Sequence, residues 1–183
     1  MKQRIILITL LFGFTSTYAQ SFKLLPKTSS LQWTGYGEVG NFSQSGTLKC
    51  KEGSFQLETG LITEGTLVFD MKSIQHSDRK LENHLKADDF FHVKKYPTAS
   101  FQIISDTSSN VCGVLTMHGI SNKVSMDINI HVEDDRILIT GILSIDRTKY
   151  DIKYNSSSYF QDLGNYAIKN EFDIAVDLVF ARE

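Results

Sequence analysis

The sequence predicts an all-β protein with one short helical insertion. Apolar and polar residues alternate with a period of two over residues 124–132, 137–145 and 172–180, which is typical of half-buried antiparallel strands. The first two of these runs are joined by the acidic turn in "HVEDDRIL", a hairpin pattern. Eight or nine strands with connections this short close into a barrel or pack as a sandwich.

The N-terminal residues 1–19 have the pattern of a secretory signal peptide. Two basic residues precede an apolar stretch over residues 5–14, which is too short to span a bilayer, and Thr-Tyr-Ala at 17–19 is a small-x-small cleavage site. We expect cleavage after Ala19 and one folded domain over residues 20–183. No later stretch approaches 18 consecutive apolar residues, so we expect no transmembrane segment. An uncleaved anchor is the alternative.

The earlier strands have weaker patterns, and one segment breaks the β pattern. These strands are expected at residues 30–36, 42–50, 54–57, 65–71, 101–103 and 111–117. Residues 78–89 predict a short helix, because Ser77 or Asp78 can cap its start and Leu81 and Leu85 stand at i and i+4. Pro97 then starts the next strand, where a missing N–H costs least.

Charge and cysteine content narrow the function classes. The net charge of −2 is spread along the chain, so no basic patch indicates a nucleic-acid partner. Cys50 and Cys112 are the two cysteines of the sequence, and an even number of cysteines in an exported protein suggests a disulfide. However, Cys50 shares the parity of the inward residue Leu48, whereas Cys112 has the parity opposite to Leu115. We therefore expect two free thiols on different faces of the sheet.

The residues expected to face the interior are large and apolar. They are Trp33, Phe42, Phe69, Phe101, Leu115, Met117, Ile139 and Phe172. An eight-stranded barrel has an interior just wide enough for packed side chains or for one slender ligand. From these residues alone, a filled core is the simpler interpretation and a ligand tunnel is the alternative.

Arg147, Phe90 and Phe91 are expected at the ends of the barrel. Arg147 continues the two-residue spacing of Ile139 and Ile145, so its guanidinium should point inward at the end of a strand. A buried unpaired cation is very costly. Arg147 should therefore either pin strand ends through a carboxylate and backbone carbonyls, or meet the polar head of a ligand. Phe90 and Phe91 follow the helix and should close one end, as a lid over a ligand cavity or as a passive cap.

The histidines do not predict a metal site or a catalytic centre. His84 and Asp88 stand at i and i+4 on the expected helix, and His76 and His92 flank it, but no HExxH spacing is present. No Gly-x-Ser-x-Gly elbow supports a Ser-His-Asp triad. We expect no metal, no catalysis, and a buried or capping hydrogen bond for His84.

Three motifs resemble the YceI-like family. The stretch "FDMKSIQHSDRKLENHLKADDFFHVKKYPTASFQ" is similar to the family signature at Asp70, Ser73, Ile74, His84, Leu85, Asp89, Phe90, Phe91, Tyr96, Pro97 and Phe101. The stretch "GVLTMHGISNKVSMDI" matches at Gly113, Leu115, Thr116, Gly119, Ser121 and Val124. "SIDRTKYDIKY" is similar to a third motif, but Asp151 stands where glycine is common, which puts the local turn in doubt.

The resemblance implies a specific fold and ligand. It implies an eight-stranded antiparallel, lipocalin-like β-barrel whose apolar tunnel binds a polyisoprenoid-type lipid, such as a long-chain quinone, in the periplasm or outside the cell. It implies that the protein is not an enzyme and has no cofactor apart from the lipid. A homodimer is possible. The expected ligand-binding residues are Trp33, Phe42, Phe69, Phe90, Phe91, Phe101, Leu115, Met117, Ile139, Arg147 and Phe172. The alternatives are a filled structural or stress-related partner-binding barrel and, with less support, a periplasmic hydrolase.

Overall fold

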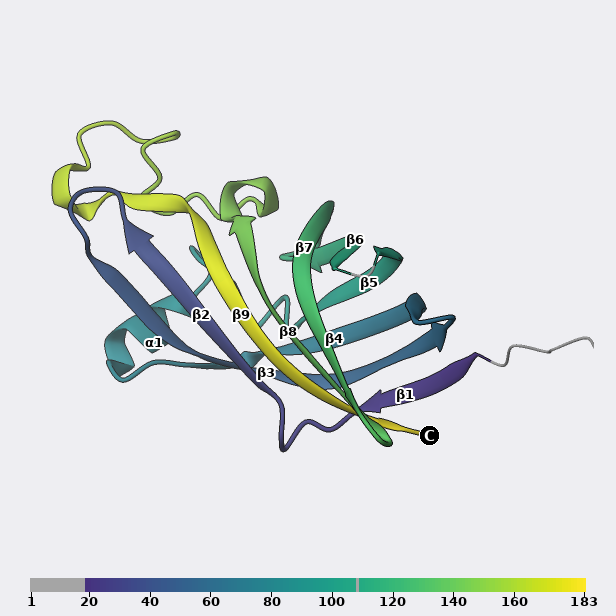
Figure 1. Ribbon diagram of the computed structural model, residues 1–183. Helices are drawn as coiled ribbons and strands as arrows, with labels where there is room; N and C mark the ends of the chain where they lie inside the picture. The colour runs from purple at the N-terminus through teal and green to yellow at the C-terminus, as the bar shows by residue number, and fades with distance from the viewer. Residues whose placement is uncertain (1–18, 108) are drawn as a thin grey trace, which may run out of the picture.

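The computed structural model describes residues 19–107 and 109–183, and residues 1–18 of the expected signal peptide lie outside it. The described residues form an antiparallel sheet with one α-helix (Figure 1). The elements are β1 (Gln20–Leu24), β2 (Ser30–Gly37), β3 (Ser43–Glu58), β4 (Leu61–Gln75), α1 (Arg79–Leu85), β5 (Thr98–Thr107), β6 (Asn110–Met117), β7 (Ile120–Glu133), β8 (Arg136–Asp146), the 3₁₀ helices η1 (Arg147–Tyr150) and η2 (Gly164–Tyr166), and β9 (Ile168–Arg182). None of the described helices is long and apolar enough to cross a bilayer.

The nine strands occupy eight positions around a closed barrel. Sequential strands from β2 to β9 pair as neighbours, with β4 paired to both β3 and β5, and β9 returns to β2. β1 and β2 share one position, because both lie between β3 and β9: Phe22 pairs with Phe55 and Arg182, and Leu31 pairs with Leu48 and Val176. The expected eight-stranded antiparallel barrel is therefore confirmed, with β1 as a short strand that the sequence did not predict.

The barrel has two ends that differ in their connections. The helix end carries α1, the β2–β3 and β6–β7 turns, η1 and the long segment before β9 (Figure 1). The C-terminal end carries the β3–β4, β5–β6 and β7–β8 turns together with the end of β9. The interior of the barrel runs from the helix end to the C-terminal end.

Two local expectations need correction. The strands expected at 42–50 and 54–57 are one strand, β3, whose pairing with β4 shifts in register near Cys50 and Glu52 without ending the strand. The expected helix over 78–89 ends at Leu85, and the chain continues in turns in which the N–H of Phe91 bonds the carbonyl of Leu85. The expected cap is confirmed, since the Asp78 carboxylate accepts from the Lys80 N–H at 2.7 Å.

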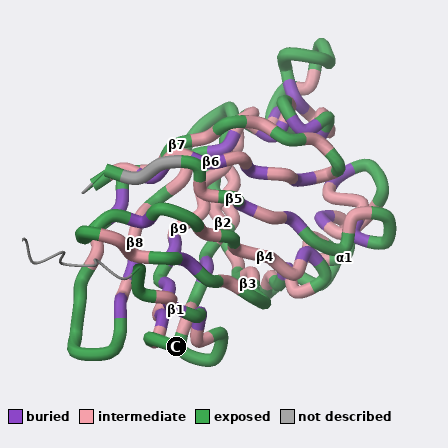
Figure 2. Tube along the Cα trace, turned by 90° about the vertical axis from the view of Figure 1, so that its right-hand side faces the viewer, coloured by how far each residue is buried: buried purple, intermediate pink, exposed green. Residues whose placement is uncertain are grey.

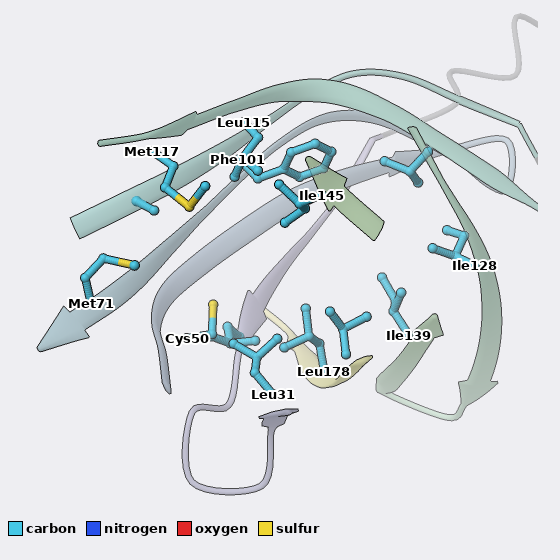
Figure 3. Packing of buried hydrophobic residues seen from close by; sticks show 14 of the residues in the cluster. Leu31, Cys50, Met71, Phe101, Leu115, Met117, Ile128, Ile139, Ile145 and Leu178 are labelled. Carbon is cyan, nitrogen blue, oxygen red and sulfur yellow. The ribbon is translucent and has the colours of Figure 1, made fainter. Parts of the chain in front are cut away.

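The core lies inside the barrel and follows the predicted alternation. Buried and half-buried residues alternate strictly along β6, and this alternation is visible along the strands in Figure 2. Side chains from opposite walls, such as Met117, Leu31 and Leu178, point toward a common centre in Figure 3. The inward face of each strand therefore forms one continuous apolar interior.

The two cysteines are free, as the parity of their strands predicts. Cys50 is buried on the inner face of β3, and Cys112 is half-buried on β6. Burial raises the pKa of the Cys50 thiol to about 12. Cys50 is therefore a neutral core residue at physiological pH rather than a reactive thiol.

Candidate functional site

An apolar cavity runs along the inside of the barrel. Its volume is about 150 Å³, and its lining extends from Ile62 and Phe180 at the C-terminal end to Leu85 and Phe90 at the helix end. On β9 alone the lining reaches from Ile168 to Phe180. At about 3.3 Å per residue and a typical barrel tilt of about 40°, this stretch covers roughly 30 Å along the barrel axis. The cavity is therefore long and narrow, which suits a chain-like apolar molecule.

Ten of the eleven expected site residues line this cavity. They are Trp33, Phe69, Phe90, Phe91, Phe101, Leu115, Met117, Ile139, Arg147 and Phe172. The expectation for Phe42 is wrong, because its side chain is 62% exposed. β3 begins only at Ser43, and Phe42 lies in the β2–β3 turn, where its carbonyl accepts from the Gly37 N–H at 2.9 Å. The alternation of inward and outward residues does not continue past the rim of the barrel.

Phe90 and Phe91 close the helix end of the cavity. Phe90 is buried, and Phe91 is half-buried with its ring centroid 6.1 Å from that of Phe172 on β9. The two neighbouring rings lie 5.0 Å apart. Leu85, at the end of α1, is also buried and also lines the cavity. The segment after α1 therefore covers this end and contributes to the cavity wall at the same time.

Arg147 is buried at the helix end and is held by backbone carbonyls. Its side chain is 2% exposed, and it donates to the carbonyls of Lys169 (3.1 Å), Ile152 (2.9 Å) and Ile168 (3.1 Å). Burial lowers the pKa of this guanidinium, and the negative charges of Asp146 and Glu171 oppose the shift. The expected inward orientation and carbonyl contacts are thus confirmed, but the expected direct carboxylate partner is absent among the described residues.

The guanidinium of Arg147 keeps donors available. It has five N–H groups, and three of them are used by the carbonyls. The remaining N–H on each terminal nitrogen has no partner among the described residues. Arg147 also lines the cavity, and its guanidinium carbon lies 5.7 Å from the centroid of the Phe90 ring. The cavity is thus lined beside its aromatic cap by a guanidinium with two unused N–H groups, in a wall that is otherwise almost entirely apolar.

His84 lies against the same aromatic cap. Its ring centroid is 4.4 Å from that of Tyr154 and 6.0 Å from that of Phe90. The expected hydrogen bond is not made: Nε2 is buried without a partner in the described part of the chain, and Nδ1 lies 3.8 Å from the Asp89 carboxylate. The described residues also contain no cluster of three or more His, Cys, Asp or Glu side chains able to hold a metal ion.

Gly35 is a cavity residue that the sequence analysis did not identify. It lines the cavity on β2, two residues after Trp33, and a Cβ built on it would meet no heavy atom within 4 Å. Gly113, which also faces inward, differs completely, because a Cβ there would lie 2.3 Å from the Phe101 ring. The two-residue spacing of Gly35 from Trp33 indicates that Gly35 faces inward. This spacing cannot tell a glycine beside empty cavity space from one against which a side chain packs.

Comparisons with known proteins agree with this architecture. The YceI-like domain family matches residues 22–180. A UPF0312 protein of Staphylococcus aureus is 33% identical over 92 residues, covering 46% of this chain and 54% of that protein, so the chain spans about half the length of the curated relatives it matches.

Two solved structures share the fold. Burkholderia cenocepacia BcnA has a TM-score of 0.71 at 18% identity, covering 85% of this chain and 98% of that one. A polyisoprenoid binding domain from Saccharophagus degradans has a TM-score of 0.68 at 16% identity, covering 90% and 99%. At this identity the structures support the fold alone. The family match, over most of the chain, shows that this protein belongs to the YceI-like domain family.

Proposed function

We propose that this protein is a binding or carrier protein for a polyisoprenoid-type lipid, held in the barrel cavity of a periplasmic or secreted protein. The observation that carries the proposal is the long apolar cavity, lined almost entirely by hydrophobic side chains from strands β2 to β9. The name of the Saccharophagus degradans neighbour, a polyisoprenoid binding domain, supports the same ligand class. The export pattern of residues 1–19 supports the location.

The chemistry of the cavity fits an isoprenoid tail. Such a tail has no hydrogen-bonding group, so it needs no partner in a dry apolar wall. Burial contributes about 0.8 kcal/mol per CH₂-sized group, so one isoprene unit gains roughly 2–4 kcal/mol before the costs of association. A few buried units are enough for micromolar binding.

Arg147 is the proposed contact for the polar end of the lipid. A guanidinium suits the oxygens of a phosphate or a carbonyl group, and Arg147 has two unused N–H groups where the cavity meets the aromatic cap. This places the polar group at the helix end and the tail toward the C-terminal end. Phe90 and Phe91 would then act as a lid over the headgroup.

A filled barrel without a ligand is the second candidate, and the size of the cavity favours it. A void of about 150 Å³ is close to the size that holds one benzene-sized molecule. A longer tail therefore requires lining side chains to move. Met71, Met117 and Met126 are suited to this, because the unbranched thioether chain adapts to irregular space.

Solvent extraction of the purified protein followed by mass spectrometry tests the proposal. We expect an isoprenoid lipid in extracts of the wild type and its absence from extracts of Gly35→Phe, whose ring would occupy open cavity space. Gln32→Phe is the matched control, because it adds the same ring to the exposed face of the same strand. Equal lipid in all three proteins would show that the lipid lies elsewhere, and no lipid in the wild type would favour the filled barrel.

A further inference from the structure

The barrel wall has a break between β7 and β8. The ladder that joins these strands covers only Ile128–Glu133 and Arg136–Gly141. Residues 120–127 of β7 pair with β6 alone, and residues 142–146 of β8 pair with β9 alone, and both stretches are fully described. In Figure 1, β7 and β8 lie together near their shared turn and separate toward the helix end. We call this break the β7–β8 slit.

The slit is bounded at both ends, so it is an internal gap in the backbone pairing rather than a frayed edge. Toward the C-terminal end it stops where Gly141 pairs with Ile128. Toward the helix end, η1 joins back to β7: the Asn122 amide donates to the Lys149 carbonyl at 3.1 Å. His118, in the β6–β7 turn, also bonds the Tyr150 carbonyl at 2.9 Å.

The rims of the slit are continuous with the cavity. Met126 on β7 and Leu143 on β8 are half-buried, and both line the cavity together with Ile145. On the outer side, Ile142 is 65% exposed beside the same opening. Apolar side chains therefore lie on the outer surface beside the slit, on both of its rims and on the cavity wall.

The C-terminal end of the barrel does not offer a comparable route. At the C-terminal end, Phe22, Phe55 and Phe180 are each at most 3% exposed and pack ring against ring, with centroids 5.3 Å apart for Phe22 and Phe55 and 4.7 Å apart for Phe55 and Phe180. At the helix end, Phe90, in the segment after α1, and Arg147 are buried, whereas the lining residues Gly35 and Phe91 are half-buried, so this end is the competing route. Opening the C-terminal end would require core side chains to be exposed, which is costly.

We infer that the β7–β8 slit is the entry and exit route for the hydrocarbon tail of the lipid, which passes sideways through the barrel wall. This inference rests on the proposed lipid-binding function. Widening the slit breaks no ladder hydrogen bond, since the two stretches are already unpaired with each other. A tail in transit meets Ile142, Met126 and Leu143 in turn, so its apolar surface stays covered while it moves.

A cross-link across the slit tests the route. If the β7–β8 register is continued, Ser125 and Ser144 stand directly opposite each other, and both are exposed. We would link Ser125→Cys and Ser144→Cys with a short bismaleimide in a Cys112→Ser background. Cys50 can stay, because it is buried with a thiol pKa of about 12.

The matched control cross-links the intact part of the same ladder. Asn129 and Thr140 are paired, so Asn129→Cys with Thr140→Cys places the same linker where no opening exists. The readout is the rate of binding of geranylgeraniol, an isoprenoid alcohol, followed by the fluorescence of Trp33. Trp33 is the single tryptophan of the chain and lines the cavity. A Ser144→Cys variant carrying a bulky maleimide tests the same route without requiring the link to form.

The outcomes separate this inference from the proposed function. We expect the slit cross-link to slow both association and dissociation by about tenfold or more, and the control cross-link to leave both rates unchanged. Unchanged rates with a linked or bulk-labelled slit, or equal slowing by both cross-links, would overturn the inference while leaving lipid binding intact. If the uncross-linked protein and the wild type do not bind geranylgeraniol, the proposed function fails together with its route.

Discussion

The two ends of the barrel are closed by aromatic rings, but the closures differ in their chemistry. At the C-terminal end, Phe22, Phe55 and Phe180 form an apolar cluster in which each ring contacts another ring. At the helix end, the ring of Phe90 faces the cation of Arg147 and the imidazole of His84. There, two N–H groups of Arg147 and Nε2 of His84 have no partner among the described residues.

The two ends also differ in backbone conformation. Of the seven non-glycine residues with positive φ in the described chain, five lie at the helix end: His92, His118, Asp151, Asn155 and Asp162. Only Thr59 and Asp134 lie in turns of the C-terminal end. Left-handed conformations of non-glycine residues and unpaired buried polar atoms both cost stability, and both gather at functional sites. The helix end thus holds most of the costly features, and it is the end at which we propose that the lipid headgroup binds.

Phe180→Ala should have the largest effect on stability. Phe180 is 1% exposed, so its removal leaves a large void and should lower the free energy of unfolding by about 3–5 kcal/mol. Chemical denaturation measures this loss, and the affinity of the remaining folded protein for geranylgeraniol should change far less. A large loss of affinity in stable folded protein would mean that the ring of Phe180, which lines the cavity where the tail is proposed to lie, contributes as much to binding as the helix end does.

Phe90→Ala should lower the free energy of unfolding less than Phe180→Ala does, but it should weaken lipid binding more. Phe90 is 8% exposed and packs partly on polar groups, so we expect a loss of about 3 kcal/mol, at the low end for a buried phenylalanine. Phe91→Ala is the comparison, because Phe91 is only half-buried and should cost less. Both losses are measured by urea titration. Equal lipid affinity in the wild type and Phe90→Ala would identify the segment after α1 as a passive cap.

Arg147→Met separates a structural role from a ligand role. The variant keeps an apolar stem but leaves the carbonyls of Lys169, Ile152 and Ile168 without their donor, so we expect a loss of about 1–3 kcal/mol. The headgroup proposal adds that geranylgeranyl pyrophosphate should lose affinity while geranylgeraniol does not. Arg147→Lys keeps a charge and serves as control. Equal losses for both lipids, or for neither, would leave Arg147 with a purely structural role.

The sequence predicted the antiparallel strands because alternation directly reports which face of a strand is buried. The choice of an eight-stranded barrel over a sandwich came from the resemblance to the YceI-like family. The sequence also placed Arg147 inside the barrel, since strict two-residue spacing continues to the end of β8. It failed for Phe42, because alternation contains no signal for the point where a strand passes the rim. It also failed for β1, whose five residues share a barrel position with β2 and were too short to be recognised.

Other features depend on contacts that no local pattern contains. The carbonyls that hold Arg147 come from β9 and from the residue after Asp151, and their position is fixed only in the closed barrel. The β7–β8 slit is equally invisible, because Val124 and Met126 alternate as they would in a fully paired strand. The alternation of apolar and polar residues shows which face of a strand is buried. It carries no information on whether a neighbouring strand pairs with the backbone.

Cys50 gives a smaller effect that depends on pH. Burial raises the pKa of the Cys50 thiol to about 12, above its ordinary value of 9.0. The unfolded chain therefore loses this proton first, so stability is unaffected below pH 9 and falls as the pH rises from 9 toward 12. Urea titrations of the wild type and Cys50→Ala at pH 8 and pH 10.5 measure the difference. The wild type should lose more stability between these two pH values, and equal losses would contradict the burial of this thiol.

The smallest expected effect is a gain in stability from Asp151→Gly. Asp151 ends η1 in the left-handed region with φ of 62°, a conformation that glycine adopts without strain. The turn at Asp151, where the family commonly has glycine, is therefore formed with aspartate in a conformation typical of glycine. Asp151→Gly should raise the free energy of unfolding by about 0.5 kcal/mol or slightly more. An opposing term is the ion pair between Asp151 and Lys153, at 2.6 Å, which is exposed and contributes little.

The pH dependence of this gain separates the two terms. The hydrogen bond and charge of Lys153 lower the pKa of Asp151, so the ion pair stabilises the fold above the ordinary pKa of 3.8 and is lost as the pH falls through the folded value. The advantage of Asp151→Gly should therefore be larger at pH 3 than at pH 7 in thermal melts. Asp134→Gly is the matched control at the C-terminal end: it relieves a φ of 47° at a carboxylate for which the described residues hold no ion pair. If Asp134→Gly gains stability and Asp151→Gly loses it at both pH values, the left-handed turn at the helix end requires the aspartate itself, and strain is not what distinguishes the two ends.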